Sequence, residues 1–312
     1  MFEKRIGNYL LPPGIDIFER GWLSANNIFL FSEEDVSLVD SGYCAHQQMT
    51  VDLVSNALKQ HGLNKLNKVV NTHLHSDHCG GNAALLEAFD CEAWIPEAEA
   101  IAVQDWDENL LSFQQLGQDC PRFTHHDVLV PGQEITLGPY RWQILGAPGH
   151  DNHSIMLYQE QHQILISADA LWEEGFGVIF PELWGEGGFE EVAQTLELIE
   201  GLPIALVIPG HGKPFTDVRK SIDIAKSRLD YLSSDAERNA RHGAKVLLKY
   251  KLLEWRSLGL VEVNRWIADT PALESIRQQM NLSAEDFQGW LIQALVKSKA
   301  AAIEDNHLVN LD

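Results

Sequence analysis

The sequence predicts an α/β fold in which two sheets pack together with helices outside, followed by a smaller helical module. Strand-like segments come in two blocks with helical segments between them, a pattern typical of two packed sheets. Beyond about residue 216 helical patterns dominate, and the charge balance shifts. The 312 residues suffice for a large domain with an appendage. We therefore expect a main domain over residues 1–218 and a C-terminal module over residues 219–312.

The first block of elements runs up to a histidine-rich loop. Strands are expected where β-branched and aromatic residues cluster, and helices where apolar residues recur every three to four positions. These rules predict strands at 27–31, 36–42 and 68–73, and helices at 50–61 and 83–89. The residues between 70 and 82 thus join a buried strand to a helix, a usual place for functional residues.

The second block continues the pattern after a less regular stretch, residues 100–127, which we interpret as a loop or helical lid over a site. Strands are predicted at 135–137, 141–145, 154–158, 163–167 and 205–210, and a helix at 189–200. In the module, Ser283 and Asp286 resemble a capping box that starts a helix reaching about Lys297. Two short strands around Asp305-Asn306 should follow, which makes the module winged-helix-like.

Composition and charge restrict the partners. The formal net charge is −22; residues 1–218 hold 9 Lys/Arg and 32 Asp/Glu, whereas residues 219–312 hold 14 and 13. An acidic main domain repels phosphate backbones, so nucleic acid is not favoured. The four cysteines form no CxxC pair, and neither a signal-peptide core nor a membrane-length apolar stretch is present. We expect a cytoplasmic protein without a membrane partner.

One short stretch concentrates side chains that bind metals. Residues 71–81 read N-T-H-L-H-S-D-H-C-G-G. In an extended segment His73 and His75 point the same way, while Asp77 and His78 lie after a bend and can face a second ion. Imidazole nitrogen and carboxylate oxygen are ligands of catalytic zinc and related metals. The stretch therefore predicts a two-metal site.

Three further candidate ligands each follow a predicted strand. His150 lies in G-A-P-G-H-D, Asp169 follows Q-I-L-I-S-A, and His211 lies in V-I-P-G-H-G. Glycine and small residues beside them allow sharp backbone turns. We expect these three side chains to converge with the histidine stretch at one edge of the sheets.

These motifs resemble those of the metallo-β-lactamase-like hydrolase superfamily. Residues 72–81 meet T-H-x-H-x-D-H-x-G-G in full, the later P-G-H, Asp and P-G-H-G segments come in family order, and L-V-D-S-G matches the first motif with Asp40. The resemblance covers roughly residues 20–215 and implies an αββα metallo-β-lactamase-type sandwich with a binuclear site. Residues 72–82 are also similar to the glyoxalase II group of thioesterases.

The resemblance implies two ligand sets and one shared ligand. The first metal would be held by His73, His75 and His150, and the second by Asp77, His78 and His211, with Asp169 bridging both. Asp40 would orient ligands without binding metal. His153 lies three residues after His150, where relatives often place a histidine four residues on, so its role stays open.

The resemblance further implies an enzyme, a metal-dependent hydrolase. Two divalent metal ions, with zinc favoured and iron or manganese left open, would share a bridging hydroxide that attacks a small ester, thioester or lactone. Asp77 could also accept a proton as a catalytic residue. Two alternatives are a metal-dependent ribonuclease, against which the acidic main domain argues, and a mononuclear iron persulfide dioxygenase, which the complete second ligand set disfavours.

The segment after Asp169 bears on the substrate. Residues 171–188 contain no Lys or Arg but hold the aromatic residues Trp172, Phe176, Phe180 and Trp184 and the acids Glu173, Glu174, Glu182 and Glu186. We expect this loop to border the pocket and to favour a neutral or modestly charged small molecule. The module shows no basic stripe in sequence, so we expect it to shape the pocket or a homodimer interface.

Overall fold

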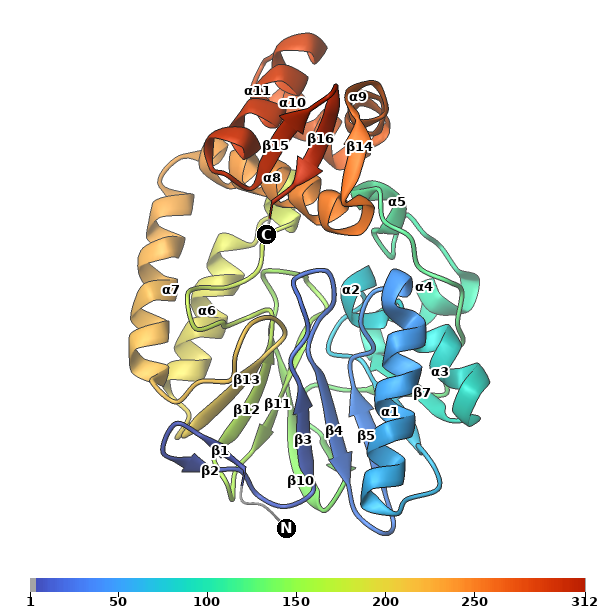
Figure 1. Ribbon diagram of the computed structural model, residues 1–312. Coiled ribbons are helices and arrows are strands. Elements are labelled where there is room, and N and C mark those ends of the chain that lie inside the picture. The colour runs from blue at the N-terminus through green and yellow to red at the C-terminus, as the bar shows by residue number, and fades with distance from the viewer. Residues whose placement is uncertain (1–3, 312) are drawn as a thin grey trace.

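The computed structural model describes residues 4–311 as two packed sheets flanked by helices, with a smaller module at one end (Figure 1). The six-stranded sheet has the order β3-β4-β5-β6-β7-β8, and the five-stranded sheet the order β13-β12-β11-β10-β9. The first comprises Ile15–Phe18, Asn27–Phe31, Val36–Val39, Lys68–Val70, Glu92–Pro96 and Asp127–Leu129 (β3–β8). The second comprises Glu134–Leu137, Tyr140–Gly146, Ile155–Gln159, Ile164–Ala168 and Leu206–Pro209 (β9–β13). The expected sandwich is confirmed.

Apolar side chains from both sheets fill the space between them. Val39 and Val70 of the six-stranded sheet share a buried cluster with Trp142, Ile166 and Ile208 of the other. Strands β11 and β12 are buried along their whole length, which explains their nearly continuous apolar sequences. A small hairpin, β1 (Arg5–Ile6) and β2 (Tyr9–Leu10), precedes the sheets.

Helices cover the outer face of each sheet. The six-stranded sheet carries α1 (Gln47–His61) and α3 (Asn82–Phe89), and the five-stranded sheet carries α6 (Phe189–Glu200) and α7 (Val218–Ser233). Helix α1 buries Val54 and Leu58, as the sequence spacing predicts. It ends at Gly62, which adopts a left-handed conformation (φ 68°) and donates its N–H to the carbonyl of Leu58.

Strand direction brings the candidate ligands to one edge of the sandwich. Strands β5 and β6 are parallel neighbours, as are β12 and β13. Strand β10 runs antiparallel to β11, which runs antiparallel to β12, so β10, β12 and β13 point the same way. Each candidate ligand follows the carboxyl end of one of these strands. The convergence expected from the sequence therefore follows from topology.

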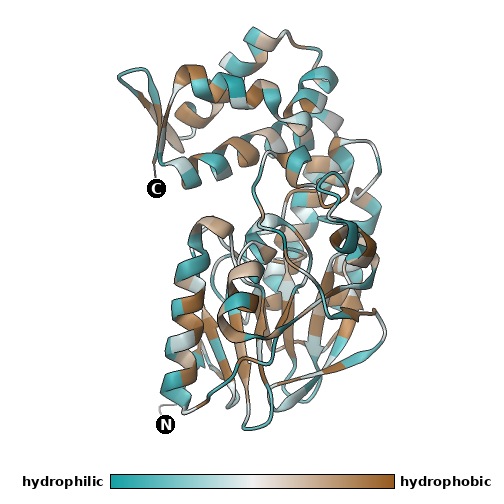
Figure 2. Cartoon of the chain, turned by 90° about the vertical axis from the view of Figure 1, so that its right-hand side faces the viewer, coloured by the Kyte–Doolittle hydropathy of each residue, from teal (hydrophilic) through white to brown (hydrophobic). Residues whose placement is uncertain are grey.

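The C-terminal module has its own apolar cluster. It contains α8 (Ala236–Trp255), α9 (Leu260–Asp269), α10 (Pro271–Gln279), α11 (Ala284–Lys297) and the sheet β14-β16-β15, with bounds Ser257–Gly259, His307–Asn310 and Ala301–Glu304. Ser283 accepts the Asp286 N–H at 3.1 Å and caps α11 as predicted. Figure 2 shows these helices grouped apart from the sheets, with the strands of the sandwich largely apolar.

Packing links the module to the sandwich through two segments. Helix α7 follows the expected boundary at residue 218, yet its residues Ile222 and Leu229 pack in one cluster with the five-stranded sheet. Val178, Phe180 and Leu183, from the loop after β12, pack instead in the cluster of the module. The division into independent domains at residues 1–218 and 219–312 stays a prediction.

The stretch at 100–127 contains two short helices, α4 (Ala100–Asp105) and α5 (Phe113–Leu116). Trp106 and Phe113 pack against the apolar cluster around Ile95, so they belong to the core. Strands β3, β7 and β8 are absent from the expectations above because each is only three to five residues long. No helix within residues 4–311 is long and apolar enough to cross a bilayer.

Candidate metal centre

The histidine loop begins where β6 ends and closes with α2 (Ser76–Cys79), a single helical turn. The loop packs tightly against the turn after β5. A Cβ on Gly81 would lie 2.4 Å from the carbonyl oxygen of Ser41, so only glycine permits this approach. Cys79 is fully buried and packs as a small apolar thiol.

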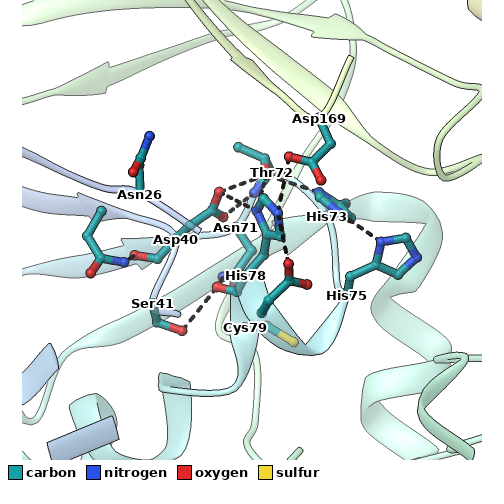
Figure 3. A network of polar contacts seen from close by, with 12 residues as sticks. Asn26, Asp40, Ser41, Asn71, Thr72, His73, His75, His78, Cys79 and Asp169 are labelled. Carbon is teal, nitrogen blue, oxygen red and sulfur yellow. Dashed lines mark hydrogen bonds and ion pairs between the residues drawn. The ribbon is translucent and has the colours of Figure 1, made fainter. Parts of the chain in front are cut away.

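Three imidazole nitrogens meet at one side of the site. His73 Nε2 lies 3.0 Å from His75 Nδ1, which lies 2.9 Å from Nε2 of His150 (Figure 3 shows the first pair). Burial, together with the neighbouring His75, lowers the pKa of His150 to about 4. Burial and the neighbouring imidazoles likewise hold the pKa of His73 well below its usual value. Neutral rings whose lone pairs converge form a suitable site for a divalent cation.

A second group lies beside the first. Asp77 Oδ2 is 3.0 Å from His211 Nε2 and 4.0 Å from His78 Nε2. The Nε2 atom of His78 is buried without a hydrogen-bond partner among the described residues. Burial opposes a charge on His78, but Asp40, Asp169 and Asp77 outweigh it and raise the pKa well above its usual value. The environment thus favours positive charge at this nitrogen, which a bound metal would supply.

The carboxylate of Asp169 lies between the two groups. Its Oδ2 is 3.4 Å from His150 Nε2 and 3.8 Å from His211 Nε2, and its Oδ1 is 3.5 Å from His78 Nε2. Burial opposes ionisation of Asp169, yet the imidazoles of His211 and His78 hold its pKa well below the usual range. Asp169 and the imidazoles around it therefore form a donor set that could hold a metal ion.

Neighbouring groups fix the orientation of the candidate ligands. Asp40 faces Nδ1 of His78 at 2.8 Å, and the carbonyl oxygen of Val178 faces Nδ1 of His150 at 2.6 Å. Each contact leaves Nε2 of the ring directed into the site. The indole N–H of Trp172 donates to Asp169 Oδ1 at 3.2 Å. The orienting role expected for Asp40 agrees with this geometry.

His153 lies outside the seven-residue cluster. Its Nδ1 is 2.9 Å from Oε1 of the buried Glu99, and its backbone N–H donates to Asp151. Asp151 in turn places Oδ2 3.7 Å from His75 Nε2. These contacts support the loop that carries His150. They give His153 a structural role, which the sequence had left open.

A cleft of about 1140 Å³ opens onto the cluster. On the sandwich side it is lined by the candidate ligands His75, Asp77, His150, Asp169 and His211. Leu116 and Gln118 also line it, so the end of the 100–127 stretch does border the site.

The loop after Asp169 contributes less to this cleft than the sequence predicts. Trp172 and Phe180 line it, but Phe176 and Trp184 do not. None of the four glutamates of the loop is among the residues that line the cleft, so their charge is not evidence for a neutral substrate. Glu182, for example, turns away to accept the N–H of Phe189 at 3.0 Å.

A basic wall of the cleft comes mainly from the module. It carries the cationic side chains Lys245, Lys249, Arg256 and Lys297, and Arg228 of helix α7 adds a fifth cation. These residues form no basic stripe in the sequence because they belong to separate elements of a nearly charge-balanced segment. The regular spacing of cations along α8 was the one signal available in the sequence.

A sandwich of this kind, with seven His and Asp side chains converging past its strand ends, defines a class of metal-dependent hydrolases. The chain belongs to the metallo-beta-lactamase superfamily, whose model matches residues 20–211.

Several known proteins are similar to this chain in sequence or in fold. A hydroxyacylglutathione hydrolase of Bdellovibrio bacteriovorus is 30% identical over 43% of this chain, and this chain spans only 44% of that relative. A probable metallo-hydrolase of Bacillus subtilis is 29% identical over 64% of this chain and 89% of its own. A metallo-beta-lactamase family protein from Thermus thermophilus has a TM-score of 0.58 at 16% identity, covering 96% of this chain and 99% of that one. This last likeness shows the fold alone.

Proposed function

We propose that this protein is a binuclear metal-dependent hydrolase of a small ester, thioester or lactone, with zinc as the favoured metal. The observation that carries the proposal is the position of Asp169. One carboxylate lies 3.4 Å from His150 Nε2 and 3.5 Å from His78 Nε2, so it can serve both ligand groups. One ion would be held by His73, His75 and His150, and the other by Asp77, His78 and His211.

Metal ions bound in these groups would supply Lewis acidity and a hydroxide nucleophile at neutral pH. The protein's own residues supply orientation and proton transfer. Asp77 lines the cleft, and its Oδ2 lies 3.0 Å from His211 Nε2, so it can accept a proton at the reacting face. Trp172 and the carbonyl of Val178 hold Asp169 and His150 in place, which reduces reorganisation during the reaction.

Aromatic side chains beside the ligands support an acyl substrate. Trp22 stacks on the ring of His211 at 5.5 Å and meets Trp172 edge-on at 5.4 Å. Trp22 is 56% exposed, so this pair offers apolar surface at the reacting end of the cleft. Several relatives carry the name hydroxyacylglutathione hydrolase, which also supports hydrolysis of an acyl compound.

Turnover of a substrate panel tests the reaction. Zinc-loaded protein should hydrolyse acyl thioesters or lactones with kcat/KM well above that for phosphodiesters and short RNA. Asp77→Ala should lower turnover by roughly two or more orders of magnitude, a usual loss for a group acting in proton transfer, with an unchanged circular dichroism spectrum. A clear preference for RNA would favour the ribonuclease alternative, and near-normal turnover of Asp77→Ala would remove this residue from the mechanism.

Metal stoichiometry tests the binuclear part separately. Elemental analysis of protein reloaded with zinc should give two ions per chain. A firm value of one would favour the mononuclear alternative, and a value near zero would refute the metal centre.

A further inference from the structure

One wall of the cleft is positively charged although the sandwich as a whole is acidic. Five cationic side chains line it: Arg228 of α7, Lys245 and Lys249 of α8, Arg256 just after α8, and Lys297 of α11. The carboxylates among the described lining residues are Asp77 and Asp169, both candidate metal ligands whose charge bound cations would offset. Cationic side chains therefore outnumber carboxylates among the described lining residues, in a protein of net charge −22.

The cations of α8 form a stripe along the helix. Lys245 and Lys249 are four residues apart, which places them on one edge of the helix, and Arg256 follows directly after its end. Val246 and Leu253 line the cleft beside them. Helix α8 thus presents a surface with an apolar strip and a basic strip side by side.

Two of the five cations are available to a ligand. Lys245 and Lys297 form no hydrogen bond or ion pair with the described residues, whereas Lys249 donates to the carbonyl of Ala300 and to Asn310, and Arg228 donates to His242. Lys245 is half-buried. A partly buried ammonium attracts an anion more strongly than a fully solvated one, because less water screens the pair.

The loop after β12 fixes this basic wall opposite the candidate ligands. Asn239 of α8 donates to the carbonyl of Ile179 at 2.9 Å, and Gly243 packs closely against Val178 and Leu183. The carbonyl of the same Val178 faces His150 Nδ1 at 2.6 Å. One short loop therefore sets both the orientation of a ligand and the position of α8.

The size of the cleft limits what can occupy it. A volume of about 1140 Å³ is at the upper end for small-molecule sites, so it accommodates considerably more than a simple acyl group. A substrate with its carbonyl at the ligands can contact other residues that line the same cleft, among them Lys245 and Lys297.

We propose, on the basis of the hydrolase function above, that the substrate is a small acyl compound whose non-reacting end is anionic. Lys245 and Lys297 would bind a carboxylate or a phosphate at that end, and the carbonyl carbon would lie at the metal ligands beside Trp22 and Trp172. An ammonium group pairs well with either anion. The basic wall removes the reason for expecting a neutral substrate, since the glutamates that supported it do not line the cleft.

A series of matched thioesters tests the proposal. All carry the same acyl group, and the thiol is neutral N-acetylcysteamine, 3-mercaptopropionate with one carboxylate, or phosphopantetheine with a phosphate. At low salt we expect kcat/KM for at least one anionic member to exceed that for the neutral member by roughly tenfold, the gain typical of one charge-assisted hydrogen bond. The preferred member distinguishes carboxylate from phosphate, and added salt should weaken the preference.

The variant Lys245→Met/Lys297→Met should raise KM for the anionic members about tenfold and leave the neutral member unchanged. Lys220→Met removes the same charge at the exposed start of α7, outside the cleft, and should change nothing. Calorimetric binding of an inert thioether analogue gives a readout that does not depend on turnover. The Kd of the thioether should increase in the double variant and stay unchanged in Lys220→Met.

The outcomes separate this proposal from the hydrolase function. Equal kcat/KM for all three thioesters, unaffected by the double variant, would overturn the anionic substrate and leave the hydrolase standing. If metal-loaded protein hydrolyses no thioester or lactone, the proposed function fails. An unchanged Kd of the thioether in the Lys245→Met/Lys297→Met variant would also overturn the proposal. Faster cleavage of short RNA than of any thioester would do the same.

Discussion

Nδ1 of His78 lies 2.8 Å from Oδ2 of Asp40, and both side chains are almost completely buried. Oδ1 of the same carboxylate accepts the backbone N–H of Thr72 at 2.9 Å. Asp40 thus ties the end of β5 to the start of the histidine loop and directs His78 Nε2 towards Asp77 and Asp169. Figure 3 shows Asp40, His78 and Asp169 together.

Asp40→Asn should weaken binding of metal at the His78 side by roughly ten- to a hundredfold, the usual effect of losing a carboxylate that orients a ligating histidine. Asp40 has φ 58°, a left-handed conformation that asparagine tolerates, so the substitution mainly removes charge. Competition with a chromophoric chelator measures the affinity. Asp90→Asn, at an exposed left-handed position with φ 49°, is the matched control. Equal affinity of both variants would show that Asp40 does not tune the site.

Gly210→Ala should disrupt the centre by steric conflict. A Cβ at this position would lie 2.2 Å from Asp169 Oδ1 and 2.9 Å from His78 Cε1, well inside van der Waals contact. Because Asp169 must move, we expect metal content to fall to one ion per chain or fewer. Gly201→Ala, whose nearest neighbouring atom would be 3.5 Å away, should retain full metal content in elemental analysis. Full metal content in Gly210→Ala would mean that Asp169 is not required at its present position.

His242 predicts a pH dependence of stability. Burial, assisted by the nearby Arg228 and Lys245, lowers the pKa of His242 to about 3. Arg228 Nη2 lies 2.7 Å from His242 Nε2, so the arginine donates to a neutral ring. Below pH 6.5, the ordinary histidine pKa, the unfolded chain binds a proton that the folded chain does not bind until about pH 3. The stabilisation of the folded state by neutral His242 is therefore fully present above pH 6.5, and it is lost as the pH falls from 6.5 towards 3.

Urea unfolding of metal-free protein measures this effect. A single such group changes the free energy of unfolding by at most about 1.4 kcal/mol per pH unit. Between pH 7 and pH 5 the wild type should lose about 2 kcal/mol more than His242→Gln, which cannot titrate. Identical pH slopes for the two proteins would contradict a buried neutral imidazole.

Removing the module should expose apolar surface. A chain truncated after Ser233 leaves Val178, Phe180 and Leu183 without the cluster that now covers them. We expect aggregation and strong binding of a hydrophobic dye. Adding Phe180→Gln and Leu183→Gln to the truncated chain should reduce dye binding. A monodisperse truncated protein without dye binding would show that the sandwich does not need this cover.

Local sequence was sufficient for most of the elements. The helix at Phe189–Glu200 was predicted to the residue, and Ser283 caps α11 as its spacing with Asp286 indicated. Strands β7 and β8 were missed because five and three residues are too few to show a clear alternation. The Trp106 segment was interpreted as a lid although it packs in the core, since an aromatic residue in an irregular segment suits both roles equally.

The sequence by itself determined the candidate ligands. Their residue types stand within one short loop or directly after strands, and parallel strand direction then brings these positions to one edge, so local patterns carry the information. The tertiary structure decided the walls of the cleft. Lys245 and Lys297 lie more than 50 residues apart in the chain and about 70 or more beyond Asp169, and whether such side chains face a cleft depends on how whole helices pack. The glutamates at 173–186 do not line the cleft for the same reason. The sequence shows their charge, but the packing of their loop against the module decides which residues face the cleft.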